Sequence, residues 1–265
     1  MNILVCIKQV PETTDVKINP ETNTLVREGV ASIVNPFDMY AVEQALKLRD
    51  QYGGKVHVIT MGPPQAEQAL KETVELGADE IHHVCDRAFA GSDTWATGWT
   101  LAAAIRKIGE PEPIDLVICG KQAIDGDTAQ VGPGVAEFLD WPFIGYIRKV
   151  CEFKDGRLRV ERASDFGHDV LETPLPAVIT VLKEIGEPRL PSLKGKMRAK
   201  KIKAPMLTAA ALGLQDKDLG LKGSPTVVSK IFSPPKRESH AEFLSGTPEQ
   251  IADQLHGRLK EAMIL

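Results

Sequence analysis

The first two-thirds of the chain alternates short apolar runs with longer amphipathic stretches. Runs rich in Ile, Val and Leu predict buried strands, and stretches in which apolar residues recur every three or four positions predict helices. Strands separated by helices of about 12–16 residues are typical of right-handed βαβ units. We therefore predict an α/β fold, with a mostly parallel open sheet and helices on both of its faces. The predicted strands are 2–10, 55–61, 80–85, 114–119 and 146–153, and the predicted helices are about 36–48, 65–76, 94–108 and 128–139.

Several residues mark where these elements begin and end. Asn35 is predicted to cap the helix that starts with Pro36, and the segment Ser92-Asp93-Thr94 to cap a later helix. Gly77 is predicted to end the second helix. Residues 15–27 alternate polar and apolar side chains around an Asn-Pro-Glu-Thr-Asn turn, so we expect a hairpin there.

The last part of the chain follows a different pattern. Residues 157–162 are predicted to pair antiparallel with 150–153, and residues 177–182 form another buried strand. Residues 205–235 predict an extended arm that contributes little to a core, and residues 250–263 predict an amphipathic helix. A long C-terminal tail on a compact α/β body suggests that the tail wraps around a partner.

The composition is that of a packed globular protein. The chain has 265 residues, of which 43% are hydrophobic and 26% charged, and a formal net charge of −4. This balance argues against nucleic-acid binding over a large surface and against a role at a membrane surface. No apolar stretch approaches the roughly 18–20 residues of a membrane span, and the first residues lack the basic segment of a signal peptide. We therefore expect a reduced, cytoplasmic protein with no membrane segment.

No metal motif or catalytic motif stands out. The four cysteines are too widely spaced for a Cys-x-x-Cys pair, and Cys6, Cys85 and Cys119 lie in strand-like runs as small apolar side chains. His82 and His83 alternate across a predicted strand, so their side chains point to opposite faces and do not readily share one metal. We therefore predict no metal site and no catalytic side chain, which disfavours a hydrolase or a metalloenzyme.

Residues 120–133, GKQAIDGDTAQVGP, join the fourth predicted strand to its helix and form the densest set of small and polar residues. Gly120, Gly126 and Gly132 allow positive φ and close approach of a ligand. A helix N-terminus presents free N–H groups and a partial positive charge, so a phosphate is the expected ligand. The alternative is a plain capped turn in which Asp127 is the N-cap.

Two other loops are predicted at the same edge, because open parallel sheets bind ligands beyond the carboxyl ends of their strands. Residues 35–38 and 61–63 offer positions where an adenosine fits against main chain, although each is also an ordinary helix start. Arg87 follows the third strand and either contacts an anionic cofactor or pairs with Asp86. The residues alone therefore indicate an α/β protein that binds a nucleotide.

Five blocks of sequence together resemble the beta subunit of electron transfer flavoproteins. They are VCIKQVPET near the N-terminus, VNPFDMYAVEQAL at 34–46, VITMGPPQAEQALKETVELGAD at 58–79, GKQAIDGDTAQVGP at 120–133 and LDWP at 139–142. The resemblance extends in order over essentially the whole chain. It implies an adenine-nucleotide-alpha-hydrolase-like fold and a heterodimer with an alpha subunit that carries an FAD.

Within that family the chain looks like the electron-bifurcating members, which hold a second FAD in the beta subunit. Housekeeping members hold a structural AMP there and typically read Asp-Asp-Asp-Cys-Asn-Gln-Thr-Gly where this chain has DGDTAQVG at 125–132. Residues 86–94, DRAFAGSDT, also resemble the bifurcating group. The resemblance implies that NADH delivers hydride to the beta-subunit flavin. One electron would then pass to a low-potential ferredoxin or flavodoxin, and the other through the alpha-subunit FAD to an acyl-CoA dehydrogenase.

The resemblance also implies where the cofactor lies. The flavin diphosphate is expected near residues 127–130, with the adenosine near Cys6, residues 35–38 and Met61. No side-chain nucleophile is expected, because the flavin does the redox chemistry while the protein positions it. The expected cofactor-binding residues are Cys6, Asn35, Pro36, Phe37, Asp38, Met61, Gly62, Thr94, Gly120, Gln122, Ala123, Asp125, Gly126, Asp127, Thr128, Ala129, Gln130, Val131 and Gly132.

Two further roles are assigned through the resemblance. Arg87 is the candidate for binding NADH. The segment 188–203 corresponds to the family's dehydrogenase-recognition loop, with Leu193 as the apolar anchor beside Lys194 and Lys196, in a stretch that prolines keep extended. Without the resemblance, a solvated basic helix is the alternative for this segment.

The resemblance divides the chain into a nucleotide- and flavin-binding domain, 1–186, and a docking loop with an arm that wraps the alpha subunit, 187–265. Two other functions stay open. One is a non-bifurcating beta subunit with structural AMP, against which Gly126, Thr128 and Val131 count. The other is a stress-protein-like ATP-binding regulator, whose Gly-x-x-Gly spacing followed by Gly-Ser/Thr is missing.

Overall fold

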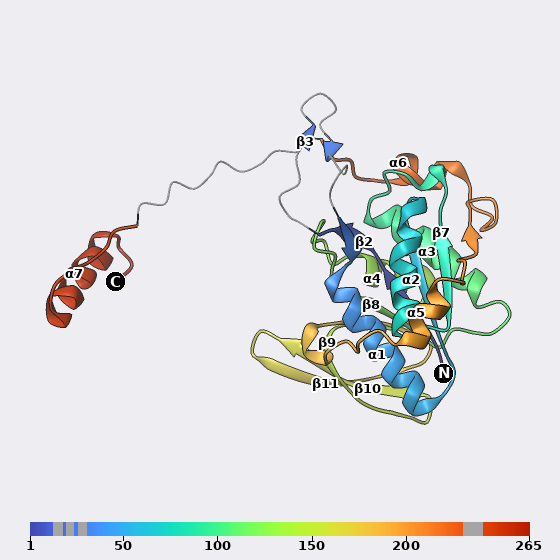
Figure 1. The fold of residues 1–265 in the computed structure, drawn as a ribbon, viewed down its shortest axis with the longest axis horizontal. Coiled ribbons are helices and arrows are strands. Elements are labelled where there is room, and N and C mark those ends of the chain that lie inside the picture. Colours follow the sequence, from blue (N-terminus) through green and yellow to red (C-terminus); the bar gives the residue numbers. More distant parts are fainter. Residues whose placement is uncertain (13–17, 20–23, 26–30, 230–240) are drawn as a thin grey trace. The chain divides into compact units, whose positions relative to one another are not determined.

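The computed structural model describes residues 1–12, 18–19, 24–25, 31–229 and 241–265 of the chain (Figure 1). They belong to two compact units, Met1–Ser229 and Lys230–Leu265. The first unit is built on a nine-stranded sheet, and the described part of the second contains one helix. None of the helices in the described part of the chain is long and apolar enough to span a bilayer.

The nine-stranded sheet has the order β11-β10-β9-β12-β8-β1-β6-β7-β13. Neighbours from β9 to β13 in this order run parallel, whereas β10 and β11 extend the sheet antiparallel. The predicted α/β class with a mostly parallel sheet is therefore confirmed. The strands are β1 (Asn2–Ile7), β6 (Lys55–Met61), β7 (Glu80–Val84), β8 (Leu116–Gly120), β9 (Phe143–Lys154), β10 (Arg157–Ser164), β11 (Gly167–Pro174), β12 (Ala177–Val181) and β13 (Met206–Leu207).

Helices cover both faces of this sheet, as the apolar periodicity predicts. One buried cluster joins the sheet to α1 and α2, and a second joins the opposite face to α3 and α4. In Figure 1, α1 and α2 lie in front of the sheet. The helices of the first unit are α1 (Pro36–Tyr52), α2 (Glu67–Leu76), α3 (Thr94–Ile108), α4 (Val131–Leu139), α5 (Leu193–Ala199) and α6 (Gly220–Gly223), with 3-10 turns at Pro64–Ala66, Arg87–Phe89, Lys183–Ile185 and Asp216–Asp218.

Two small antiparallel sheets accompany the large one. β2 (Gln9–Pro11) pairs with β5 (Ser32–Val34). β3 (Ile18–Asn19) pairs with β4 (Thr24–Leu25), which confirms the predicted hairpin, although its turn at residues 20–23 lies outside the described residues. The predicted pairing of 150–153 with 157–162 is also confirmed.

Two expectations about secondary structure are wrong, and one strand was not predicted. The helix predicted from residue 128 begins at Val131, because Asp127 and Ala129 have φ of 56° and 54° and cannot continue a right-handed helix. β11 is absent from the prediction. The segment 205–229 is no extended arm, because β13 pairs with β7 and both Ala209 and Leu219 are buried in the second cluster.

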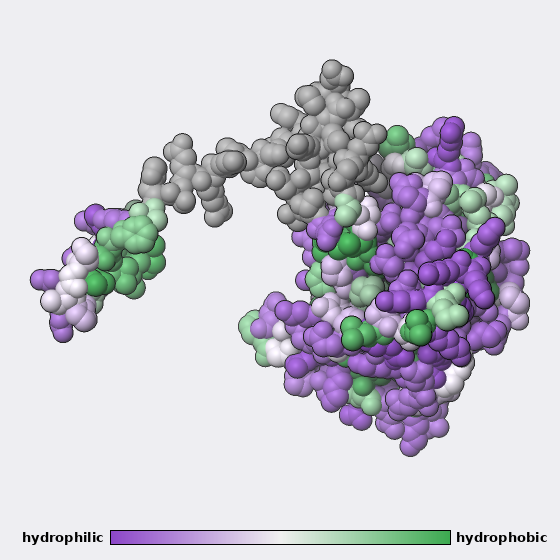
Figure 2. All heavy atoms as spheres, viewed as in Figure 1, coloured by the Kyte–Doolittle hydropathy of each residue, from purple (hydrophilic) through white to green (hydrophobic). Residues whose placement is uncertain are grey.

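The second unit contains α7 (Pro248–Glu261), as its sequence predicts. Thr247 and Gln250 form a capping box at its start, in which each side chain accepts from the other residue's backbone N–H. Ile251, Leu255 and Leu259 recur at four-residue spacing, which places them on one side of the helix. None of the α7 residues is buried in the described structure, and one side of this unit is hydrophobic in Figure 2.

Candidate functional site

The carboxyl ends of β1, β6 and β8 meet at one edge of the sheet. Cys6 pairs with Cys119 across β1 and β8, and Ile7 pairs with Thr60 across β1 and β6. Met61 packs against the apolar cluster that contains both cysteines. The structure therefore brings together the loops that the sequence assigns to the cofactor. Pro36 starts α1, Gly62 follows β6 and Val131 starts α4 at this edge.

Asn35 fastens two of these loops to each other. Its side chain is fully buried, donates to the carbonyl of Gln122 at 2.8 Å, and accepts from the N–H of Ile124 at 3.1 Å. Asn35 does occupy the N-cap position of α1, but its side chain makes no capping hydrogen bond. Asn35 therefore lies at the predicted N-cap position but does not cap the helix, because both partners of its side chain are distant in sequence.

Asp38 lies buried beneath the same loops. Its carboxylate accepts from the backbone N–H of Lys8 at 2.8 Å. Burial raises the pKa of Asp38 to about 7, although hydrogen bonds from the backbone N–H groups of Lys8 and Gly120 oppose that shift. Lys8 also forms an ion pair with Asp125 at 2.7 Å, which connects the end of β1 to the loop after β8.

The predicted roles of the three glycines need correction. Gly120, Gly126 and Gly132 do not have positive φ. A Cβ at Gly120 would lie 2.4 Å from Asp38 Oδ1, and one at Gly132 would lie 2.5 Å from the Thr180 side chain, so both are small because protein atoms approach them. A Cβ at Gly126 would meet nothing within 4 Å. Gly126 alone of the three borders open space.

Positive φ instead occurs at Asp127 and Ala129, which alternate with residues of ordinary φ. In the described structure, Asp127 donates its backbone N–H to Ala123, whereas no hydrogen bond engages the N–H groups of Gly126, Thr128, Ala129 or Gln130. Alternating left- and right-handed residues turn successive N–H groups toward one side, and such nests bind anions. The loop can therefore cradle a phosphate with main-chain donors just before the N-terminus of α4.

The alternative prediction, a plain turn with Asp127 as the N-cap of the helix, is wrong. Gln130 occupies the N-cap position.

Side chains at both ends of this loop are held in place. The Gln122 amide donates to the carboxylate of Asp127. Thr94, the first residue of α3, donates its hydroxyl to Gln130 at 2.9 Å. Thr94 and Gln130 therefore meet as the expected residue set implies, although they are 36 positions apart.

The two cysteines at this edge are part of the buried apolar core. Cys6 and Cys119 are buried, and the hydrogen bond between them and burial raise the pKa of the Cys6 thiol. This confirms that they act as small apolar side chains. Cys85 is half-buried at the end of β7, and Cys151 is exposed.

Two basic residues border the site. Arg87 is exposed and forms no ion pair with any described residue. Its suggested pairing with Asp86 is wrong, because that carboxylate accepts from the backbone N–H groups of Ala88 and Ala209.

The second basic residue is Lys121, which was not among the predicted site residues. Its Nζ lies 6.0 Å from the ring centroid of Phe37 and 5.8 Å from that of Tyr146. Its position directly after the strand that ends at Gly120 indicates that it lies at this edge of the sheet.

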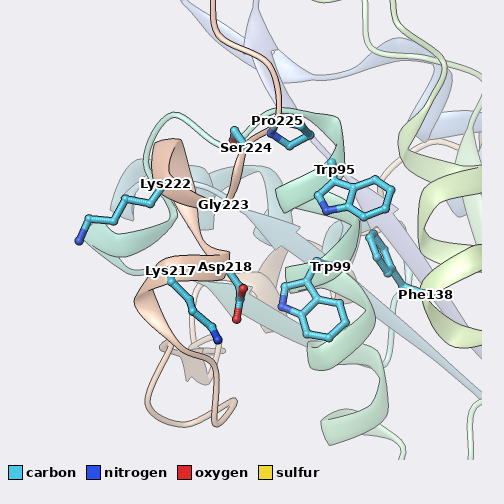
Figure 3. A pocket seen from close by; sticks show the side chains of 9 residues that line it. All are labelled: Trp95, Trp99, Phe138, Lys217, Asp218, Lys222, Gly223, Ser224 and Pro225. Carbon is cyan, nitrogen blue, oxygen red and sulfur yellow. The ribbon is translucent and has the colours of Figure 1, made fainter.

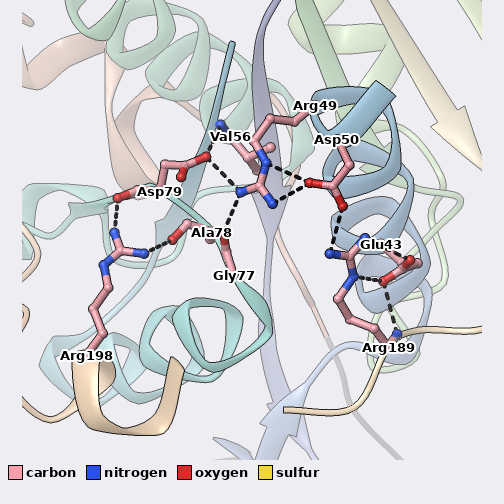
Figure 4. A network of polar contacts seen from close by, with 9 residues as sticks. All are labelled: Glu43, Arg49, Asp50, Val56, Gly77, Ala78, Asp79, Arg189 and Arg198. Atoms are coloured by element: carbon pink, nitrogen blue, oxygen red, sulfur yellow. Dashed lines mark hydrogen bonds and ion pairs between the residues drawn. The ribbon is translucent and has the colours of Figure 1, made fainter. Parts of the chain in front are cut away.

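The 188–203 segment is firmly attached to the first unit. Arg189 pairs with the buried Glu43 at 2.8 Å and with Asp50 at 3.0 Å, and Arg198 donates to the carbonyl of Ala78 at 2.6 Å (Figure 4). These contacts fix the segment at both ends against α1 and the loop after α2.

The prediction that Leu193 lies in an extended stretch is wrong. Leu193 is the first residue of helix α5. Ser192 caps this helix by accepting from the N–H of Gly195 at 2.9 Å. Gly195 lets α5 lie directly against α2, since a Cβ there would be 2.1 Å from the carbonyl oxygen of Glu75. Leu190, Leu193 and Met197 remain 88%, 78% and 57% exposed. Exposed apolar side chains therefore lie on and just before the basic helix α5. The surface of the first unit is largely hydrophilic on the face shown in Figure 2.

A groove of about 790 Å³ lies beside α3, and sequence reasoning missed it. Trp95 and Trp99 stand one turn apart and both contact Phe138 edge to face. The Trp99 indole nitrogen faces the side of Asp218 in Figure 3 and has no hydrogen-bond partner among the described atoms. The spacing of two tryptophans by four residues was the available signal. Lys217, Lys222, Gly223, Ser224 and Pro225 complete the lining.

Comparison with known proteins matches this chain to one family. Residues 22–212 match the electron transfer flavoprotein domain. The chain is 48% identical to the electron transfer flavoprotein subunit beta of Thermoanaerobacterium thermosaccharolyticum, over the full length of both. It is 44% identical to the protein FixA of Azotobacter vinelandii, over 98% of this chain and 94% of that one. It is also 44% identical to the caffeyl-CoA reductase-Etf complex subunit CarD of Acetobacterium woodii, over the full length of both.

Proposed function

This chain belongs to the electron transfer flavoprotein family, among its beta subunits, and from that premise we propose that it holds an FAD of its own and acts in electron bifurcation. NADH is the proposed hydride donor. One electron is proposed to leave for a low-potential ferredoxin or flavodoxin. The other is proposed to pass through the FAD of an alpha subunit to an acyl-CoA dehydrogenase.

The observation that carries this proposal is the main-chain cradle at Gly126–Gln130. Its free N–H groups suit a diphosphate, and the open space at Gly126 leaves room for one. Ala129 adds only a methyl group at a position with positive φ. The residues present therefore fit the pyrophosphate of an FAD. When bound, the flavin supplies hydride acceptance and one-electron transfer.

The residues around the cradle have separate tasks in this proposal. Asn35 and Asp38 are positioning residues, because their polar atoms already bind Gln122, Ile124 and Lys8. Cys6 and Met61 provide apolar surface for the adenosine. Arg87 supplies a positive charge for the phosphates of NADH, since it is exposed and forms no ion pair with a described residue.

The dehydrogenase is proposed to dock on the 188–203 segment. Leu193 and Met197 lie one helical turn apart and are both exposed, and Lys194 and Lys196 flank them. An apolar centre inside a charged rim is typical of docking surfaces that are steered electrostatically. The naming of one relative as a subunit of a caffeyl-CoA reductase complex supports a partner that acts on an acyl-CoA.

The alpha subunit is proposed to bind the arm that ends in α7. Its apolar side, with Ile251, Leu255 and Leu259, has no buried residue in the described structure. An amphipathic helix of this kind gains stability when a partner covers its apolar side.

Cofactor counting tests the proposal. The heterodimer with the alpha subunit is purified and denatured, and the released nucleotides are separated and quantified. We expect two FAD and no AMP per heterodimer. One FAD with one AMP would overturn the proposal in favour of the non-bifurcating alternative.

A further inference from the structure

Three side chains with metal-binding atoms meet on β6 and β7, on the face of the sheet that α3 covers. His57 pairs with Glu80 in the parallel register, and Ile59 pairs with His82, so His57, Glu80 and His82 share one face. One ligand atom from each lies within 4.8 Å of the other two. His57 precedes Met61 by four residues, about 13 Å along the strand, so this cluster is separate from the candidate flavin site.

Two of the three separations between ligand atoms are already close to those of a tetrahedral metal site. His57 Nδ1 lies 3.3 Å from His82 Nε2 and 3.5 Å from Glu80 Oε2. With bonds of about 2.0–2.1 Å, the ligands of a tetrahedral ion are roughly 3.3–3.5 Å apart, whereas those of an octahedral ion are roughly 2.9 Å apart. Two imidazoles and one carboxylate also disfavour Mg²⁺ and Ca²⁺, which prefer oxygen ligands. We propose that His57, Glu80 and His82 form a Zn²⁺ site, with water as the fourth ligand.

Residues around the cluster orient the carboxylate. Lys55 Nζ lies 3.7 Å from Glu80 Oε1 and 2.9 Å from Glu112 Oε2. Lys55 thereby engages one oxygen of Glu80 and leaves the other for the metal, and Glu112 offsets the positive charge of Lys55. The contact with Glu80 is an ion pair, whereas the hydrogen bond of Lys55 goes to Glu112; outer residues that hold a ligating carboxylate are typical of protein metal sites. Glu80 is about half exposed, with 46% of its side chain accessible, so water reaches the fourth position.

The metal-free arrangement is a hydrogen bond between the two imidazoles. Their ring centroids are 5.5 Å apart and the ring planes differ by 22°, so the two nitrogens face each other nearly head-on. His57 Nε2 is buried and has no partner among the described atoms, so the proton of His57 belongs on Nδ1. When Zn²⁺ binds at Nδ1, the neutral imidazole of His57 must carry its proton on Nε2 instead. Both rings must also rotate. Because of these costs, we expect Zn²⁺ to bind more weakly here than at structural zinc sites.

Sequence reasoning correctly separated His82 from His83, whose Nε2 lies 3.1 Å from the carbonyl oxygen of Gly62. It missed His57 and Glu80, because a parallel neighbour contributes ligands from 25 positions away.

Zinc binding by the purified heterodimer of full-length chains tests the site. The protein is stripped with a chelator and titrated with Zn²⁺, and Co²⁺ is used as a coloured substitute. We expect one zinc in the wild type that is lost, or bound at least about tenfold more weakly, in His82→Ala and Glu80→Gln. Co²⁺ in the wild type should give the strong visible bands of four-coordinate cobalt.

The matched control is His168→Ala, which removes an exposed histidine on β11 and should bind Zn²⁺ as the wild type does. Flavin content and the melting temperature, measured without metal, verify that each variant is folded. Equal zinc binding by the wild type and both site variants would overturn the proposal, as would a wild type that binds none.

Discussion

The side-chain carbonyl of Asn35 accepts a hydrogen bond from the backbone N–H of Ile124 at 3.1 Å, across 89 positions of sequence. The amide nitrogen of the same residue donates to Gln122 at 2.8 Å. Because the side chain is fully buried, water cannot replace either bond. One residue therefore fixes the start of α1 to the loop that leads into the phosphate cradle.

Replacing Asn35 with alanine should weaken both the fold and the cradle. Two half-buried main-chain groups would lose their partners, so we expect the free energy of unfolding to fall by about 1–3 kcal/mol. Denaturant unfolding of the heterodimer measures this, and flavin retention on dialysis should fall with it. An Asn35→Ala protein with wild-type stability would show that this bond does not hold the loop.

The pH dependence of stability should report on Asp38. Its folded pKa of about 7 exceeds the ordinary value, so folding favours the protonated carboxyl. That contribution is complete below about pH 4 and is lost as the pH rises through about 7. We expect the free energy of unfolding to fall by about 1 kcal/mol per pH unit between pH 5 and 7. Asp38→Asn should flatten this slope, and an unchanged slope in the variant would assign the effect to other groups.

Local patterns predicted most of the strands and helices, because continuous apolar runs mark the buried strands and apolar residues at every third or fourth position mark the helices. The helix that begins at Pro36 and the strand at Lys55–Met61 are examples. Contacts between segments that are far apart in sequence cannot be inferred from such local patterns. Asn35 looked like a cap, and Gly120 looked like a ligand contact, although its neighbour is Asp38.

The cradle itself was predicted in place but not in detail. Glycine usually marks positive φ, yet here Asp127 and Ala129 adopt it while Gly126 does not. The segment around Leu193 was predicted as extended from the prolines before it, and the cap at Ser192 was not predicted. Packing of Gly195 against Glu75 decides for the helix, and no local pattern shows that contact.

Arg87 should affect the reaction with NADH and little else. Its side chain is exposed and pairs with no described residue, so Arg87→Ala should leave the fold and the flavin content unchanged. We expect flavin reduction by NADH, followed by stopped-flow absorbance, to slow about tenfold or more through loss of a charged hydrogen bond. If the reduction rate stays at the wild-type value, NADH binds elsewhere.

Leu193 should matter for docking and not for reduction by NADH. Truncating a central apolar anchor commonly costs about 2 kcal/mol, or roughly thirtyfold in affinity. We therefore expect Leu193→Ala to weaken electron delivery to the dehydrogenase while flavin reduction by NADH stays intact. Lys194→Ala is the matched control and should mainly reduce the salt dependence of association. A parallel loss of both half-reactions in Leu193→Ala would indicate a structural role instead.

The central claim is that the loop Gly126–Gln130 of this chain holds a flavin, and Gly126→Val tests it most directly. A Cβ added at this position meets no protein atom within 4 Å, so the fold should tolerate the substitution while the space for the diphosphate is lost. Gly134→Ala, at an equally open position in α4, is the matched control. The measurement is the number of FAD released per heterodimer on denaturation. We predict two for the wild type and the control and one for Gly126→Val, and two in all three proteins would contradict the account.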